Sequence, residues 1–300
     1  MTTTLLRRFP RLLSNLRVSS SISTTSSSCC CSPRPRHLSS SPSSSSSPSS
    51  SSSSRPPVCL VFGAGEAIGS AVCRRFALGG YSVVAVRRTP GSLSVLSSEI
   101  NGDKSMYPSG RLLARDGVDA REEKQVVDLV ESVESDVGQI ECVVYNIGGN
   151  ISFPFLETTT QKFTKCWDMA CLSGFLVGRE ASRVMLKRGR GTVIFTGATA
   201  STRGNSGFAA FSVAKSGLRS LAMSLAKEMG PKGLHVAHCV IDGAVDTPWI
   251  RENFKDMVAK AQKGAIVDPK DVADAYWFLH QQGRSAWTFE MDLRPFCEKW

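Results

Sequence analysis

The sequence has no acid near one end, few His and Tyr side chains, and no long apolar run. No Asp or Glu occurs in residues 1–65, although the 300-residue chain carries 26 acids against 36 Lys and Arg. His and Tyr each occur only four times. Because no 18 consecutive residues are apolar, the sequence predicts no membrane-spanning helix. The ten Cys lack the spacing of metal ligands, so we expect no metal site.

The acid-free region is also rich in Ser, Pro and Arg. Residues 1–57 hold seven Arg and a long Ser tract, a composition that cannot bury a core and predicts disorder. An Arg-rich, Ser-rich and acid-free beginning is typical of an organelle transit peptide. Leu and Arg mixed over residues 5–17 favour a mitochondrial destination, whereas the Ser tract keeps a plastid as the alternative.

Most of the positive charge belongs to this leader. The formal net charge of the chain is +10, but residues 58–300 retain only +3, so the charge gives no reason to expect a nucleic-acid partner. Seven Cys lie in this second part on apolar segments, and we interpret them as small buried side chains in a reducing compartment. We therefore expect a leader of residues 1–57 and one domain of residues 58–300.

Short apolar runs alternate with amphipathic runs from residue 58 onward. The expected strands are Val58–Phe62, Ser82–Val86, Arg111–Ala114, Cys142–Tyr145, Thr192–Thr196, Val236–Ile241 and Glu290–Leu293. The expected helices are Ala67–Leu78, Glu122–Val133, Thr159–Lys187, Phe208–Met229 and Pro269–Gln281. Such alternation predicts a single α/β domain, a Rossmann-type doubly wound parallel sheet of about seven strands with helices on both faces.

A glycine-rich turn joins the first expected strand to the first expected helix. It reads Gly63-Ala64-Gly65-Glu66-Ala67-Ile68-Gly69. Glycines allow a tight turn and let a pyrophosphate approach the free N–H groups at the beginning of a helix. A lone glycine turn is weak evidence, but its place after the first strand favours a dinucleotide site over a purely structural turn.

The end of the second expected strand bears on which dinucleotide is bound. An enzyme that uses NAD(H) needs a carboxylate here for the ribose hydroxyls, but this chain has Arg87 and Arg88 and no acid. Two guanidinium groups suit a 2′-phosphate, so NADP(H) is favoured over NAD(H). The alternative is a solvated basic loop.

The segment Phe211-Ser212-Val213-Ala214-Lys215 opens a helix that follows a buried strand and a loop. Together with the glycine turn, this order resembles the short-chain dehydrogenase/reductase superfamily over Val58 to about Pro295. Gly117-Val118-Asp119-Ala120, Tyr145-Asn146-Ile147-Gly148 and Asp242-Gly243-Ala244-Val245-Asp246-Thr247 resemble further motifs of that superfamily. The resemblance implies cofactor contacts at Gly63, Gly65, Ile68, Gly69, Arg87, Arg88, Asp119, Ala120, Asn146, Gly148, Lys215, Gly243, Val245 and Thr247. From the residues alone, Asp119 is equally well explained as the N-cap of the next helix, and it can fill both roles.

The family's catalytic group is Asn, Ser, Tyr and Lys, and the resemblance implies that this chain keeps only the Lys, as Lys215. Phe211 stands at the Tyr position, Ala198 at the Ser position, and Ala170 (Cys171 if the alignment shifts by one) at the Asn position. A phenyl ring has no proton to donate. Thr199, Ser201, Ser206 and Ser212 offer hydroxyls nearby, Tyr145 is expected on the adenosine side of the cofactor, and His238 is interpreted as a core residue.

Three functions remain open from the sequence. The favoured one is an atypical NADP(H)-dependent oxidoreductase acting on an unidentified small molecule through Lys215, a hydroxyl such as that of Thr199, or an acid of the substrate. The second is a non-catalytic NADP(H)-binding sensor or scaffold, and the third is an assembly protein that has lost the cofactor. The apolar surfaces of Thr159–Lys187 and Phe208–Met229 predict a homodimer or homotetramer. Trp249 and Phe254 are expected in an apolar lid.

Overall fold

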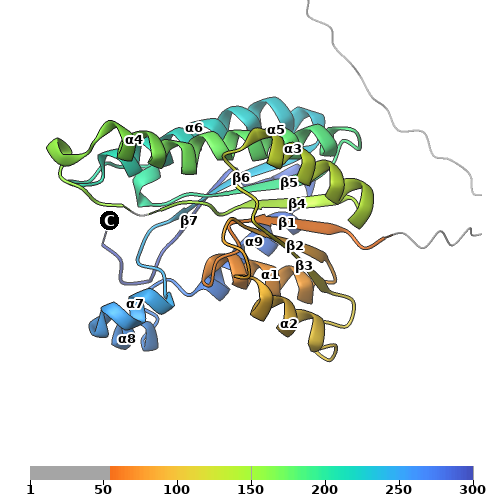
Figure 1. Ribbon diagram of the computed structural model, residues 1–300, viewed down its shortest axis with the longest axis horizontal. Coiled ribbons are helices and arrows are strands. Elements are labelled where there is room, and N and C mark those ends of the chain that lie inside the picture. Colours follow the sequence, from red (N-terminus) through yellow and green to blue (C-terminus); the bar gives the residue numbers. More distant parts are fainter. Residues whose placement is uncertain (1–54, 150, 300) are drawn as a thin grey trace, which may run out of the picture. The chain divides into compact units, whose positions relative to one another are not determined.

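The computed structural model describes residues 55–149 and 151–299, so nearly all of the expected leader lies outside the described residues. Seven parallel strands form one sheet in the order β3-β2-β1-β4-β5-β6-β7 (Figure 1). The strands are β1 (Val58–Phe62), β2 (Ser82–Arg87), β3 (Arg111–Asp116), β4 (Ile140–Tyr145), β5 (Gly191–Thr196), β6 (Leu234–Ile241) and β7 (Glu290–Leu293). The predicted doubly wound α/β domain is confirmed.

Helices cover both faces of this sheet (Figure 1). They are α1 (Ile68–Leu78), α2 (Ser94–Gly102), α3 (Glu123–Ser132), α4 (Thr160–Trp167), α5 (Ser173–Leu186), α6 (Ala209–Met229), α7 (Pro248–Asn253), α8 (Lys255–Gln262) and α9 (Pro269–Gln281). Successive strand residues point to opposite faces. Cys59 and Val61 of β1 accordingly pack with α1, α2 and α9, whereas Val58, Leu60 and Phe62 pack with α3, α5 and α6. Both faces are buried, which explains why the strands are continuously apolar.

Part of the helix prediction was wrong. The expected helix Thr159–Lys187 is interrupted by a π-helical turn, Asp168–Leu172, which separates α4 from α5. The hydroxyl of Tyr145 donates to the main-chain oxygen of Met169 (2.7 Å) inside this turn. A π-helical turn changes the pairing of main-chain carbonyls, which explains how a side chain from β4 takes one of them. No periodicity in the sequence marks this change.

Three helices were not predicted. Helix α2 buries only Leu96 and Ile100, so its apolar pattern is too sparse to stand out. Helices α7 and α8 occupy the expected lid, where the rings of Trp249 and Phe254 meet edge to face with centroids 5.4 Å apart. No helix within residues 55–149 and 151–299 is long and apolar enough to cross a membrane.

Most of the seven cysteines that the structure describes are core residues, as predicted. Cys59, Cys73, Cys142, Cys166 and Cys239 are buried, Cys171 is partly buried and Cys297 is exposed. Cys59 of β1 lies opposite Cys142 of β4 in the strand register, on the face that α1 and α9 cover, and both are free thiols. The burial of five thiols fits the interpretation of cysteine as a small apolar side chain.

Candidate cofactor and active site

A cavity of about 770 Å³ opens where β1, β2 and β4 end. This is the point at which the sheet order reverses, because β1 pairs with β2 on one side and with β4 on the other. Open α/β sheets bind ligands at such a point. The predicted cofactor residues that line the cavity are Gly63, Gly65, Ile68, Gly69, Arg87, Arg88, Asp119, Ala120, Asn146, Gly148, Val245 and Thr247. Lys215 and Gly243 do not line it.

The glycine turn has the shape that the sequence suggested. Gly63 has a φ of +80°, and a Cβ on it would lie 2.6 Å from the main-chain oxygen of Asn146. A Cβ on Gly69 would collide with the oxygen of Gly63. A Cβ on Gly65 would meet nothing closer than 4.0 Å. The first and third glycines thus allow close packing within the protein, whereas Gly65 leaves room in the cavity itself.

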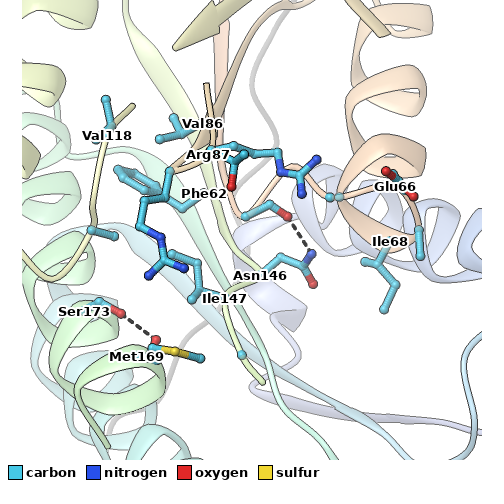
Figure 2. A pocket seen from close by; sticks show the side chains of 18 of the residues that line it. Phe62, Glu66, Ile68, Val86, Arg87, Val118, Asn146, Ile147, Met169 and Ser173 are labelled. Carbon is cyan, nitrogen blue, oxygen red and sulfur yellow. Dashed lines mark hydrogen bonds between the residues drawn. The ribbon is translucent and has the colours of Figure 1, made fainter. Parts of the chain in front are cut away.

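Asn146 fastens the glycine turn to the end of β4. Its side-chain amide donates to the oxygen of Gly63 (3.0 Å), and its main-chain N–H donates to the oxygen of Phe62 (2.9 Å). Figure 2 shows Asn146 reaching toward the turn while Ile68 and Ile147 border the same space. The predicted role of Asn146 in holding the sheet near the adenosine side is consistent with these bonds.

One end of the cavity is basic, and the sequence interpretation missed part of it. Arg121 lines the cavity with Arg87 and Arg88. The Nε of Arg121 donates to the carboxylate of Asp119 (2.9 Å), and the main-chain N–H of Arg121 donates to the same carboxylate (3.1 Å). These bonds lower the pKa of Asp119, with the guanidinium of Arg121 as the main cause. Direct adjacency to the Asp119-Ala120 pair was the signal that could have identified Arg121.

The N-cap alternative for Asp119 was wrong in detail. Glu122 is the residue that precedes α3, and its side chain makes no capping bond. Asp119 instead accepts from Arg121 and so closes a tight turn between β3 and α3. This turn presents the carboxylate and its guanidinium partner together at the cavity wall.

Lys215 lies directly behind the cavity wall. Its side chain projects from α6, and its Nζ donates to the main-chain oxygens of Thr196 (2.8 Å) and Ile147 (3.3 Å). The residue is 4% exposed, and burial lowers its pKa to about 8. A Cβ on Gly148 would lie 2.9 Å from Nζ, so the ammonium is against the segment that lines the cavity. Lys215 thus bridges the ends of β4 and β5 beside the predicted cofactor site.

The structure brings together the three positions that the resemblance assigned to Tyr, Ser and Asn. Phe211, Ala198 and Ala170 pack in one small apolar cluster, which also contains Cys166, Ala200, Ala210 and Ala214. The ring of Phe211 is 8% exposed. Among these members only Cys166 carries a titratable group, and burial raises the pKa of its thiol. The cluster therefore holds no side chain suited to donate a proton near neutral pH.

A polar group beside this cluster was not predicted. Asp242, 5% exposed, follows β6, and its carboxylate accepts from the hydroxyl of Thr199 (2.6 Å). The guanidinium groups of Arg203 (3.5 Å) and Arg294 (3.7 Å) lie against the same carboxylate. The Thr199 hydroxyl, a candidate acid in the sequence, thus directs its proton to Asp242. Forty-three positions separate Thr199 from Asp242, so no local motif could reveal this contact.

Tyr145 and His238 are both core residues, which differs from the expectation for Tyr145 and agrees with it for His238. Tyr145 is fully buried, and its hydroxyl bonds to Ser173 and to the main chain of the π-helical turn. Ser173 and Met169, not Tyr145, line the cavity; Figure 2 shows the hydrogen bond that joins these two. Burial also raises the pKa of Tyr145, so the phenol is a structural donor here. His238 is buried as predicted, with Nδ1 bonded to Glu290 (3.0 Å).

Known proteins share both the sequence pattern and the fold. Residues 57–258 match the family described as short chain dehydrogenase. The 3-oxoacyl-[acyl-carrier-protein] reductase of Bos taurus is 28% identical over 223 residues, which cover 74% of this chain and 90% of the bovine protein. A 3alpha-hydroxysteroid dehydrogenase of Mediterraneibacter gnavus is 24% identical over 238 residues, covering 78% of this chain and 93% of that protein.

Solved structures agree. A short-chain dehydrogenase from Rhodopseudomonas palustris is 43% identical, has a TM-score of 0.68, and matches 80% of this chain and 99% of its own. A metagenomic short-chain oxidoreductase in complex with NADP has a TM-score of 0.67 at 20% identity, covering 82% of this chain and all of its own, a likeness that shows the fold alone. Because the family match spans more than half of the sequence, the chain belongs to the short-chain dehydrogenase family.

Proposed function

We propose that this protein is an NADP(H)-dependent oxidoreductase of atypical mechanism, in which Lys215 supplies the proton that a tyrosine supplies elsewhere in the family. Its curated relatives include reductases and dehydrogenases, which makes an oxidoreductase the natural class. The observation that carries the proposal is the buried ammonium of Lys215 against Gly148, a residue of the cavity wall. The substrate class that follows is a small molecule with a reducible carbonyl.

The cavity residues fit a phosphorylated dinucleotide. Helix α1 begins at Ile68 without a side-chain cap, so its first N–H groups are available to an anion, and Gly65 leaves the cradle in front of them open. Arg87, Arg88 and Arg121 gather at the ends of β2 and β3, where a 2′-phosphate would need cations. These residues would hold the phosphates of NADP(H), and this supports NADP(H) over NAD(H).

The proton source follows from what surrounds the apolar cluster. When bound, the nicotinamide of the cofactor gives or takes a hydride, and the protein must give or take a proton. The residues that we infer at the Tyr, Ser and Asn positions are Phe211, Ala198 and Ala170. None of these side chains has a proton to donate. An ammonium has three N–H groups, and Lys215 commits two of them to carbonyls. With a pKa of about 8, Lys215 holds a proton at neutral pH and can release it.

Cofactor choice is tested by titrating the full-length protein with NADPH and NADH. The wild type should bind NADPH more tightly, and Arg87→Ala with Arg88→Ala should remove most of that preference. Each charge-assisted bond contributes on the order of 1.5–3 kcal/mol, roughly ten- to a hundredfold in affinity. Arg115→Ala is the matched control, because Arg115 is on β3, is not among the residues that line the cavity, and bonds to the neighbouring main-chain oxygen of Ala114. Equal affinity for NADH in the wild type would contradict the assignment.

The reaction is tested by offering NADPH with diketones, quinones and enones. Lys215→Met should lose turnover, whereas Lys215→Arg keeps the charge but cannot release a proton and should lose it too. A second candidate function, a non-catalytic NADP(H) sensor or scaffold, is favoured by the apolar character of the cluster around Phe211. Tight NADPH binding without turnover of any carbonyl would select the sensor.

A further inference from the structure

A buried polar chain begins at His238 on β6, the strand next to the edge strand β7. The side chain of His238 is fully buried, and its Nδ1 lies 3.0 Å from a carboxylate oxygen of Glu290 on the neighbouring strand β7. Arg219 of α6 holds that carboxylate with two nitrogens, each at 2.6 Å. Because a carboxylate only accepts, Nδ1 carries the hydrogen, and Nε2 is left as a bare acceptor. Within the part of the chain that the structure describes, Nε2 has no hydrogen-bond partner.

The bare nitrogen is directed toward the peptide that Lys215 also contacts. A Cβ on Gly197 would collide with Nε2 of His238. The carbonyl immediately before Gly197, that of Thr196, accepts from Nζ of Lys215 (2.8 Å). The imidazole and the ammonium are therefore neighbours across a single peptide unit. An unpartnered buried acceptor is costly unless something donates to it, and Lys215 has one N–H not committed to these carbonyls.

The end of this buried polar chain that lies at Glu290 and Arg219 reaches solvent. The side chain of Glu290 is 25% exposed and that of Arg219 is 34% exposed. The titratable and charged groups that face His238 are Glu290 from β7 and Lys215 and Arg219 from α6. Its partner in β5, Phe195, carries no charge. Lys215, His238 and Glu290 thus lie in series between the cavity wall and the surface, with one gap, between Nζ of Lys215 and Nε2 of His238.

The resting protonation states suit proton transfer along this series. Burial lowers the pKa of His238 to about 4, so the imidazole is neutral near pH 7 and can accept at Nε2. The guanidinium of Arg219 is the main cause that lowers the pKa of Glu290, so the carboxylate is ionised. His238 and Glu290 are therefore each in the protonation state that can accept a proton.

We infer that His238 and Glu290 carry protons between Lys215 and solvent, an inference that rests on the proposed function of Lys215. In the outward direction, a proton leaves Nζ and binds Nε2 of His238, directly or through a water molecule. The proton on Nδ1 then passes to the carboxylate of Glu290, which releases it to solvent. Inward delivery reverses these steps from the tautomer that outward transfer leaves: Nε2 gives its hydrogen to the neutral amine of Lys215, while Nδ1 takes the proton that Glu290 has bound from solvent. His238 and Glu290 are positioning and relay residues that act through Lys215.

The inference is tested without any substrate, by the exchange of the Lys215 ammonium protons with water. The full-length protein is labelled with nitrogen-15 lysine, the exchange rate at Nζ is measured by NMR, and Lys215→Arg assigns the signal by removing it. His238→Gln should slow exchange by roughly a hundredfold, the low end of what a positioned proton acceptor contributes. Glu290→Gln should slow the exchange as well. This variant becomes the test if His238→Gln does not fold.

His235→Gln is the matched control. His235 is on the same strand, is also buried, and stacks on Trp287 with its Nε2 bonded to the oxygen of Thr288 (2.9 Å). Exchange that is slowed in both test variants and unchanged in the control supports the route. Exchange that is unchanged in either test variant, or equally slowed in the control, overturns it. Failure of the proposed function is seen separately, as a wild type that binds NADPH and reduces no carbonyl.

Discussion

Returning hydroxyls to the apolar cluster gives the sharpest test of how Phe211 and Ala198 are arranged. Phe211→Tyr places one hydroxyl among the apolar side chains of the cluster, where Ala170, Ala200 and Ala214 offer no partner. A buried hydroxyl without a partner costs about 1–3 kcal/mol of folding free energy. Lys215, one helical turn further along α6, can donate to the new oxygen, but its ammonium cannot accept the new proton.

A second substitution should restore much of the loss. Ala198→Ser adds an acceptor to the same cluster, so the double variant should be more stable than the two single effects predict. We expect a coupling energy of about 1 kcal/mol, within the range of roughly 0.5–3 kcal/mol for side chains in contact. The free energies of unfolding come from urea titrations followed by tryptophan fluorescence. Phe211→Tyr with Ala181→Ser is the additive control, because Ala181 is on α5 and packs in a different core cluster from Phe211.

The same pair of changes tests the chemistry. If the protein lacks only its usual acid, the double variant should gain NADPH-dependent reduction of simple diketones by roughly 10²–10⁴-fold, the usual contribution of a positioned acid. Cofactor affinity should barely change, since Lys215 and the glycine turn are untouched. A coupling energy below about 0.3–0.5 kcal/mol would mean that the two side chains do not meet. A large loss of NADPH binding in Phe211→Tyr would refute the whole assignment of the site.

Three further predictions concern pH, assembly and destination. Because the pKa of Lys215 is lowered to about 8, its ammonium form prevails below that pH and is lost above it, so single-turnover reduction should fall as pH rises through 8. A pH-independent rate would contradict the role of Lys215. Trp167 and Phe175 on α4 and α5 are 37% and 42% exposed, so we predict a dimer or tetramer that Trp167→Glu weakens. Sedimentation of the wild type as a monomer at micromolar concentration would refute it. Residues 1–57 fused to a fluorescent protein should direct it to mitochondria, and a cytosolic signal would count against both organelles.

Local features were predictable from the sequence because each depends on neighbouring residues. The step from β1 through the glycine turn into α1 needs only an apolar run, positive φ at Gly63 and an amphipathic helix, and the helix α9 was predicted with its observed bounds. Helix α2 was missed because two buried side chains, Leu96 and Ile100, do not make a periodic pattern.

Contacts between distant segments could not be predicted in this way. Seventy-one positions separate Arg219 from Glu290, and their bond depends on the packing of α6 against β6, the neighbour of β7. The π-helical turn before α5 depends on Tyr145, which projects from another strand. Arg121 is a different case, since its charge and its position beside Asp119 were visible in the sequence. The polar groups that decide the chemistry are therefore the part of the site least accessible to sequence reasoning.

The positions of the cysteine thiols allow local unfolding of this protein to be followed by their reactivity. Cys171 and Cys297 are accessible to a thiol reagent in the native state, whereas the five buried thiols become reactive only when their surroundings open. Four of them lie in the core beneath α1 and α9, and Cys166 lies in the cluster around Phe211. Timed alkylation followed by mass spectrometry would thus distinguish opening of the active-site cluster from opening of the opposite helix layer. These two regions of the fold each carry their own label without any added probe.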